Sequence, residues 1–208
     1  MSEPKAKPTP FRRPKGWRTF DPAATMAIVF SWPDGSLTMR AAKWLFSLLA
    51  PGNVEWLNER GRIDDLRDRV VWSVCLKAPP WIKEFLFIDR DMEPDLERGS
   101  LEPFIQAAGD VVGALYPMKD DRCWAAPHQV HCGMLRVKRY VLEALAAERA
   151  VYNGLPVPVP FFKFEGGLCE CEWFIDRVRK HPAKFIVTRA GWCGHWTREQ
   201  KEWAHGTR

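Results

Sequence analysis

The most constraining feature of this sequence is a short apolar run, Glu84–Ile88 (EFLFI), that leads directly into Asp89-Arg90-Asp91. Its apolar residues do not alternate with polar ones, which is typical of a strand buried on both faces of a parallel sheet. Two carboxylates spaced by one residue just past such a strand can hold a hard divalent cation, which can in turn bind phosphates. Asp is also common in turns and helix caps, so the position after the strand is what favours a site.

Strand-like and helix-like segments alternate along the rest of the chain. Short apolar runs predict strands at Thr25–Trp32, Val54–Leu57, Asp110–Leu115 and Lys184–Thr188, and an extended segment at Gln129–Val137. Apolar residues at helical spacing predict helices at Leu37–Leu49, Ile63–Leu76, part of Leu96–Ala108, Lys138–Ala147 and Glu170–Lys180. We expect a stiff linker through Pro156, Pro158 and Pro160, and a loop at Gly191–Trp196. The alternation indicates an α/β fold with a mostly parallel, doubly wound sheet flanked by helices.

Length and charge divide the chain into two parts. The 208 residues and 46% hydrophobic content fit a single globular domain. The net charge of +5 lies entirely in residues 1–18, which hold six cationic side chains and one acidic one, while the other 190 residues carry 25 of each sign. We therefore expect a flexible, proline-rich basic arm at residues 1–22 and a folded domain at residues 23–208. The arm is either a solvated tail or a polyanion-binding element.

The chain shows no run of about 18 apolar residues and no secretory signal, so we expect no membrane span. Its six cysteines contain no C-x-x-C pair, which favours reduced thiols in a cytoplasmic protein. Zinc is an alternative, because two groups combine thiols with imidazoles: Cys123, His128, His131 and Cys132, and Cys169, Cys171, Cys193 and His195. Their one-residue gaps differ from the usual zinc spacings, so buried or partly buried free thiols are the favoured interpretation.

Six segments match, in order and at about the right spacing, the motifs of one enzyme family. They are Ile63–Val74, Phe85–Met92 (FLFIDRDM), Asp110–Pro117 (DVVGALYP), His131–Val137 (HCGMLRV), Glu170–Phe174 (ECEWF) and Gly194-His195. From about Met26 to His195 the chain thus resembles a family 2-type glycosyltransferase with the GT-A fold. The resemblance covers about four-fifths of the chain and leaves out the basic arm.

The resemblance implies a metal-dependent transfer of sugar from a nucleotide-sugar, with a UDP-sugar as the expected donor. Asp89 and Asp91, with support from His195, would hold Mn²⁺ or Mg²⁺ on the donor diphosphate. The residues implied in nucleotide-sugar binding are Ser31, Trp32, Asp34, Glu59, Arg67, Asp89 and Arg90. Those implied in acceptor binding are His131, Gly133 and Trp192.

The general base is the point at which this sequence departs from the family pattern. The family has Glu-Asp at the start of a late helix, whereas this chain has Glu170-Cys171, followed by Glu172. Either glutamate could accept a proton from an acceptor hydroxyl, and either could simply stabilise the first helical turn.

Acceptor and function class remain open between three hypotheses. The basic arm, the eleven tryptophans and the missing membrane anchor favour a polyanionic acceptor, such as hydroxymethylated bases in DNA, the modification that bacteriophages make; the host cytoplasm would then be the location. A glycan or protein acceptor is the first alternative. The second is a non-enzymatic nucleic-acid-binding module that uses the arm and stacking Trp side chains, although the neutral body and the Asp89/Asp91 pair disfavour it.

Overall fold

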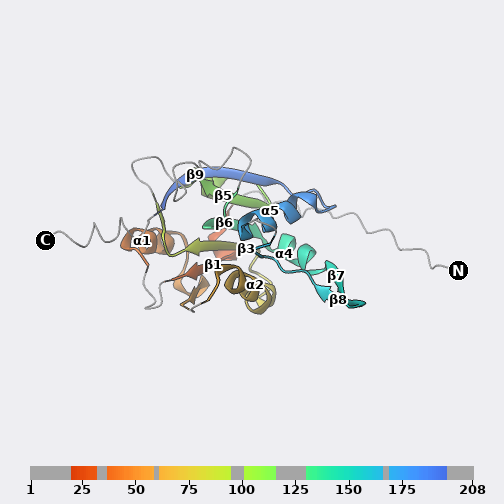
Figure 1. Ribbon diagram of the computed structural model, residues 1–208. Helices are drawn as coiled ribbons and strands as arrows, with labels where there is room; N and C mark the ends of the chain where they lie inside the picture. The colour runs from red at the N-terminus through yellow and green to blue at the C-terminus, as the bar shows by residue number, and fades with distance from the viewer. Residues whose placement is uncertain are drawn as a thin grey trace.

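The computed structural model describes residues 20–31, 37–58, 61–94, 101–115, 130–165 and 169–195. Within these ranges it forms a mixed α/β domain with a seven-stranded sheet in the order β2-β1-β3-β6-β5-β9-β4 (Figure 1). The strands are β1 Thr25–Phe30, β2 Val54–Leu57, β3 Glu84–Asp89, β4 Met92–Pro94, β5 Val111–Leu115, β6 Met134–Lys138 and β9 Val187–His195. The helices are α1 Met39–Leu48, α2 Ile63–Ser73, α3 Glu102–Gln106, α4 Arg139–Ala146 and α5 Glu170–Lys180.

Five of the seven strands of this sheet point the same way, which agrees with a mostly parallel sheet. Strand β1 pairs in parallel with β2 and β3, and β5 pairs in parallel with β9. Strand β6 lies between β3 and β5 and is antiparallel to both, while β4 is antiparallel to β9. The carboxyl ends of β1 and β3 are in register, with Phe30 opposite Asp89. This edge of the sheet therefore gathers the residues that follow two parallel strands.

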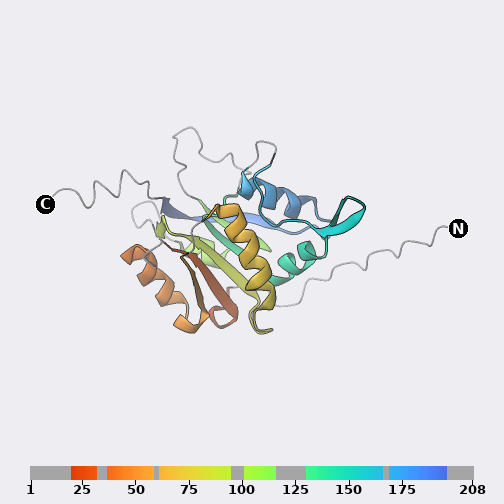
Figure 2. The same ribbon diagram turned by 60° about the horizontal axis from the view of Figure 1, so that its bottom comes forward.

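Helices cover both faces of the sheet, as expected for a doubly wound fold (Figure 2). On β3, Phe85 and Phe87 pack with α2, α4 and α5 on one face, while Leu86 and Ile88 pack with α1 and α3 on the other. All four side chains are 0–1% exposed. Burial on both faces thus accounts for the run of apolar residues without alternation.

Local sequence explains where the helices begin. Thr38 is the N-cap of α1, and its side chain accepts a hydrogen bond from the backbone N–H of Ala41 at 3.2 Å. Helix α2 begins with Asp64 and Asp65 in its first turn, where the helix dipole favours negative charge. Asp64 also accepts hydrogen bonds from Arg62 and from the backbone N–H of Phe164, so it fastens a distant segment to this helix.

Three sequence-based expectations about secondary structure are wrong. The loop expected at Gly191–Trp196 is strand through His195, and the last strand begins at Val187 rather than at Lys184. The expected linker contains the second strand of a hairpin, β7 Arg149–Tyr152 and β8 Leu155–Pro158. Pro156 and Pro158 fit there because, among the described strands, β8 pairs with β7 alone and is therefore an edge strand.

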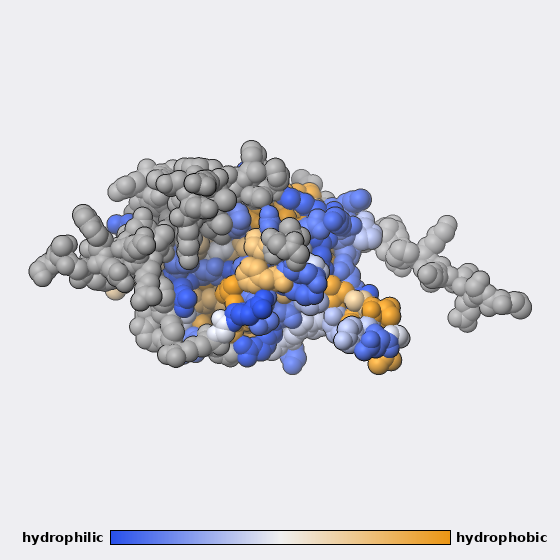
Figure 3. All heavy atoms as spheres, viewed as in Figure 1, coloured by the Kyte–Doolittle hydropathy of each residue, from blue (hydrophilic) through white to orange (hydrophobic). Residues whose placement is uncertain are grey.

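The β7–β8 hairpin carries exposed apolar side chains away from the sheet. Val151 and Leu155 are 77% and 67% exposed, and hydrophobic colouring gathers over the hairpin in the space-filling view (Figure 3). In the part of the chain that the structure describes, no helix is both long and apolar enough to cross a membrane.

The packing of β3 predicts a large cost for a cavity beneath α2. Phe87 is 0% exposed and its ring lies 6.4 Å from that of Phe30 and 6.2 Å from that of Phe162. We expect Phe87→Ala to lower the free energy of unfolding by about 3–5 kcal/mol, as large-to-small core substitutions do. Urea denaturation monitored by Trp fluorescence measures this loss in the free energy of unfolding. Phe46→Ala is the matched control, because Phe46 is 45% exposed and should lose far less.

Candidate functional site

Three of the residues implied in metal binding come together at the carboxyl edge of the sheet. Asp89 is the last residue of β3, and Asp91 follows in the turn before β4. Strand β9 ends at this edge too, and the backbone of His195 is opposite that of Met92, one residue past Asp91. The β4–β9 pairing, which the sequence analysis did not predict, therefore joins the Asp89-Arg90-Asp91 segment to the end of β9.

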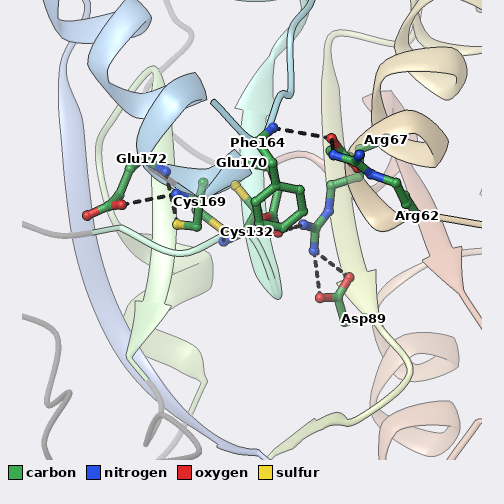
Figure 4. Close-up of polar contacts among 10 residues, drawn as sticks. Arg62, Arg67, Asp89, Cys132, Phe164, Cys169, Glu170 and Glu172 are labelled. Carbon is green, nitrogen blue, oxygen red and sulfur yellow. Dashed lines mark hydrogen bonds and ion pairs between the residues drawn. The ribbon is translucent and has the colours of Figure 1, made fainter. Parts of the chain in front are cut away.

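A buried arginine links this edge to two helices. Arg67, on α2, is 1% exposed, and its guanidinium lies between two carboxylates (Figure 4). Nη2 donates to both oxygens of Asp89 at 2.7 and 2.6 Å, and Nη1 donates to Oε1 of Glu170, the first residue of α5, at 2.5 Å. Charge-assisted contacts of this length are among the strong hydrogen bonds in proteins. An ion pair across 103 positions of the sequence, from Arg67 to Glu170, thus joins α2 to α5.

Burial and charge perturb these groups strongly. Burial raises the pKa of Asp89 to about 6, with Arg67 acting against the shift and the negative charges of Asp91 and Glu170 adding to it. Burial acts to lower the pKa of Arg67, but Asp89, nearby thiols and Glu170 hold it well above its ordinary value. Asp89 therefore releases its proton within the physiological range, whereas Arg67 stays charged.

Aromatic rings enclose the guanidinium. The Arg67 Cζ lies 5.6 Å from the ring centroid of Phe30 and 6.0 Å from that of Phe162, within the range of cation–π contacts. Phe162 reaches this position because the chain around it is tied to α2, where Asp68 accepts a hydrogen bond from the backbone N–H of Phe161 at 2.6 Å. The segment following the β7–β8 hairpin is thus one wall of the site.

The two glutamates at the start of α5 have different surroundings. Glu170 is 7% exposed and faces Arg67. Glu172 belongs to a capping box: its Oε2 accepts from the backbone N–H of Cys169 at 3.2 Å, and its own N–H donates to the Cys169 Sγ at 3.5 Å. In Figure 4, Glu172 points away from Arg67 and Asp89. Of the two candidates for the base, only Glu170 lies beside the other site residues.

Beside Glu170 the structure assembles a group of sulfur and imidazole ligands. His131, Cys169 and Cys171 each offer a ligand atom, and these three atoms all lie within 4.8 Å of one another. The Cys171 Sγ also accepts a hydrogen bond from the backbone N–H of Cys132 at 3.1 Å. The neighbouring Cys171 thiol and burial raise the pKa of Cys169, and the neighbouring Cys132 thiol raises that of Cys171.

Other residues named from the sequence have varied positions. Ser31 is 5% exposed, and its hydroxyl donates to the Leu57 carbonyl at 3.3 Å. The Gly133 carbonyl accepts a hydrogen bond from the Asp89 N–H at 2.8 Å, while Arg90 is exposed in the turn. The backbones of Trp192 and His195 lie in β9, but their side chains fall outside the described part of the structure. Outside it altogether are Trp32, Asp34, Glu59, Cys123 and His128.

The partners that surround these residues do not follow from the sequence pattern. Phe162 and the pairing of His131 with Cys169 and Cys171 were not anticipated. The two thiol–imidazole groups considered for zinc do not stay separate, because His131 of the first group joins Cys169 and Cys171 of the second. One sequence signal could have indicated this group. It is the C-x-C pair of Cys169 and Cys171, at the start of a helix that also carries a candidate catalytic glutamate.

The arrangement offers two kinds of ligand side by side. The carboxylates of Asp89 and Glu170 lie at the Arg67 guanidinium, and the negative charge of Asp91 acts on Asp89; all three residues are buried or half-buried. This surplus of negative charge fits a hard divalent cation such as Mn²⁺ or Mg²⁺, which prefers oxygen ligands. The cysteines and His131 are instead soft or borderline donors.

Comparisons with known proteins support the fold alone. No protein-family model matches this chain, and no curated protein matches it. The chain is similar to A197 from STIV, known from a crystal structure, with a TM-score of 0.55 and 17% sequence identity over 84% of this chain and 86% of that one. At this identity the similarity extends to the α/β architecture.

The Arg67 bridge predicts strong destabilisation when its charge is removed. Arg67→Met leaves the buried carboxylates of Asp89 and Glu170 facing each other without a cation, so we expect a loss of about 3–5 kcal/mol in the free energy of unfolding. Chemical denaturation at neutral pH measures this loss. Arg62→Met, at the N-cap of the same helix and 62% exposed, is the control and should change stability little. Equal effects of the two substitutions would contradict the bridge.

Proposed function

We propose that this protein is a metal-dependent glycosyltransferase with the GT-A fold, which moves a sugar from a nucleotide-sugar to a hydroxyl acceptor. The observation that carries the proposal is the convergence of Asp89, Asp91, Arg67 and Glu170 at the carboxyl edge of the sheet. Strand β3 is parallel to β1 on one side and antiparallel to β6 on the other, so the pattern of the sheet changes beside this cluster. Ligands of open α/β sheets bind where the strand order reverses, beyond the carboxyl ends of strands.

The metal would be held chiefly by Asp91. Both oxygens of Asp89 accept hydrogen bonds from Arg67, so Asp89 shares its charge between the guanidinium and the cation. His195 is one residue out of register with Asp91 across the β4–β9 pair, close enough in the backbone to act as a further ligand. Bound there, Mn²⁺ or Mg²⁺ would neutralise the charge that develops on the departing diphosphate.

Arg67 takes a role different from the one that the family resemblance implies. Instead of reaching donor phosphates, its guanidinium is engaged by Asp89 and Glu170 and is 1% exposed. We therefore assign Arg67 as a positioning residue. It holds the carboxylate at the metal and the carboxylate at the acceptor in a fixed relation, which is the kind of preorganisation that transfer reactions need.

Glu170 is the better candidate for the general base. It lies on the same side as Asp89, whereas the capping box accounts for Glu172. A base in this position would accept the proton of the acceptor hydroxyl as that oxygen attacks the anomeric carbon of the sugar, and the nucleoside diphosphate would leave with the bonding electrons. An acceptor hydroxyl has to approach Glu170 from the exposed tenth of its side chain.

The acceptor that we favour is a polyanion, with hydroxymethylated DNA as the specific hypothesis. Residues 1–18 carry all of the net charge, and such a segment binds phosphates by releasing counterions. A glycan or protein acceptor is the alternative that the neutral charge of residues 19–208 would equally allow. A pure nucleic-acid-binding module would not require the carboxylates at the edge of the sheet.

The donor site predicts metal-dependent binding of a nucleotide. We expect UDP or a UDP-sugar to raise the melting temperature in the presence of Mn²⁺ and to do so much less with EDTA. Asp91→Asn removes the charge that the cation needs, so it should abolish the Mn²⁺-dependent shift. Differential scanning fluorimetry across nucleotides and UDP-sugars tests this.

The matched control is Asp65→Asn, which removes a carboxylate that is 74% exposed on α2. This variant should retain the full shift. If no nucleotide stabilises the wild-type protein with Mn²⁺, or if Asp91→Asn responds like Asp65→Asn, the donor site is misassigned.

The acceptor hypothesis predicts a separable role for the arm. Deleting residues 1–18 should weaken DNA binding and reduce the log–log dependence of affinity on salt by up to about 5, because six cationic side chains are lost. The Mn²⁺-dependent nucleotide shift should not change. Full-length protein with Mn²⁺ and a UDP-sugar panel should add a hexose-sized mass to nucleosides from hydroxymethylated DNA. Transfer only to glycan or protein acceptors would refute the DNA hypothesis while retaining the enzyme.

A further inference from the structure

His131, Cys169 and Cys171 form a compact cluster, and its two cysteines have no role in the proposed transfer reaction. The three ligand atoms lie within 4.8 Å of one another although they come from two segments nearly 40 residues apart. His131 lies just before β6, and the cysteines lie on either side of Glu170 at the start of α5. Cys171 is 6% exposed, and His131 and Cys169 are half-buried.

Each of the two sulfurs accepts a hydrogen bond from a backbone N–H, which acts against the rise in pKa that neighbouring thiols and burial cause at both cysteines. The Cys169 Sγ accepts the N–H of Glu172 at 3.5 Å, and the Cys171 Sγ accepts the N–H of Cys132 at 3.1 Å. Both cysteines also lie at the positive end of the α5 dipole, which favours thiolates. Two thiolate-stabilising devices beside a histidine are the surroundings of a metal ligand set rather than of inert core cysteines.

We propose that His131, Cys169 and Cys171 bind a Zn²⁺ ion. Sulfur and imidazole are the ligands that Zn²⁺ prefers, and three such side chains supply most of its usual tetrahedral set. The charges balance in this half-buried place, because the two negative charges of the thiolates equal the two positive charges of Zn²⁺ and the imidazole is neutral. Binding releases the two thiol protons to solvent, and no oxidant or reductant is needed.

The site would fasten the start of α5 to the segment that enters β6. Glu170 lies between the two cysteine ligands in sequence and points to Arg67, so the ion would fix the carboxylate that the transfer reaction requires. This zinc site is distinct from the Mn²⁺ or Mg²⁺ site, because the first uses sulfur and nitrogen and the second uses oxygen. The inference therefore stands on geometry of its own and does not depend on the proposed function.

Metal analysis of the full-length protein tests the proposal directly. Protein produced with Zn²⁺ in the medium and purified without chelators should contain about one equivalent of zinc by mass spectrometry. After removal of zinc under reducing conditions, added Co²⁺ should give the visible d–d bands of tetrahedral cobalt and a near-ultraviolet thiolate-to-cobalt band. Zn²⁺ should then displace Co²⁺ and bleach both.

Three substitutions locate the ligands. Cys169→Ser keeps a good N-cap, since Ser is a preferred capping residue, but removes a soft ligand, so lost metal cannot be attributed to a lost cap. Cys171→Ser and His131→Gln remove the other two ligands. We expect each to reduce bound zinc at least tenfold and to abolish or shift the thiolate–cobalt band. Cys75→Ala, which alters a cysteine 0% exposed in the core, is the matched control and should keep full stoichiometry.

The outcomes separate this proposal from the proposed function. A wild-type protein without zinc and without a thiolate–cobalt band refutes the site, as does a disulfide between Cys169 and Cys171 in freshly purified protein by mass spectrometry under non-reducing conditions. Equal zinc in wild type and Cys169→Ser also refutes it. Asp91→Asn should keep its zinc while losing the Mn²⁺-dependent nucleotide shift, so either site can fail without the other.

Discussion

A positive charge buried beneath the edge of the sheet is the constraint on which the site depends. Arg67 is carried into the interior by the apolar face of α2, and a guanidinium there is costly unless its donors are satisfied. Asp89 and Glu170 supply acceptors for its two Nη groups, from β3 and from α5. The position of three elements is thereby coupled to one side chain. The aromatic rings of Phe30 and Phe162 complete the enclosure and keep water from competing for the guanidinium.

Much of the framework could be predicted from local pattern. The apolar run of β3 and the limits of α5 follow from hydrophobic spacing alone, and the position of Asp89 at the end of a buried strand was confirmed. Pattern fails where pairing decides the outcome. The segment at Gly191–Trp196 has no strand periodicity, yet it is strand through His195 because β5 and β4 pair with it on both sides. Gly191 adopts a φ of +71° beside Phe104, a backbone conformation that sequence reasoning takes for a loop.

Only part of the site could be predicted, because some of its residues are far apart in the sequence. Arg67 and Glu170 were both named as site residues, but a single sequence cannot show that they share an ion pair across 103 positions. Glu172 illustrates the converse, since its capping role could be read locally from its place three residues after Cys169. The sulfur–imidazole cluster could be predicted only in part. Two of its members, Cys169 and Cys171, are close in sequence, whereas the third, His131, is brought to them by the fold.

The antiparallel direction of β6 determines which part of the chain borders the site next to Asp89. Since this strand runs against β3, its beginning rather than its end adjoins Asp89, and the Gly133 carbonyl is bonded there to the Asp89 N–H. In a wholly parallel sheet this position would belong to the loop that leaves the neighbouring strand. Here one side of the site is formed by the backbone of β6, which is held in place by its hydrogen bonds in the sheet. A change in what this side of the site contacts would have to come from its side chains, because its backbone has little freedom to move.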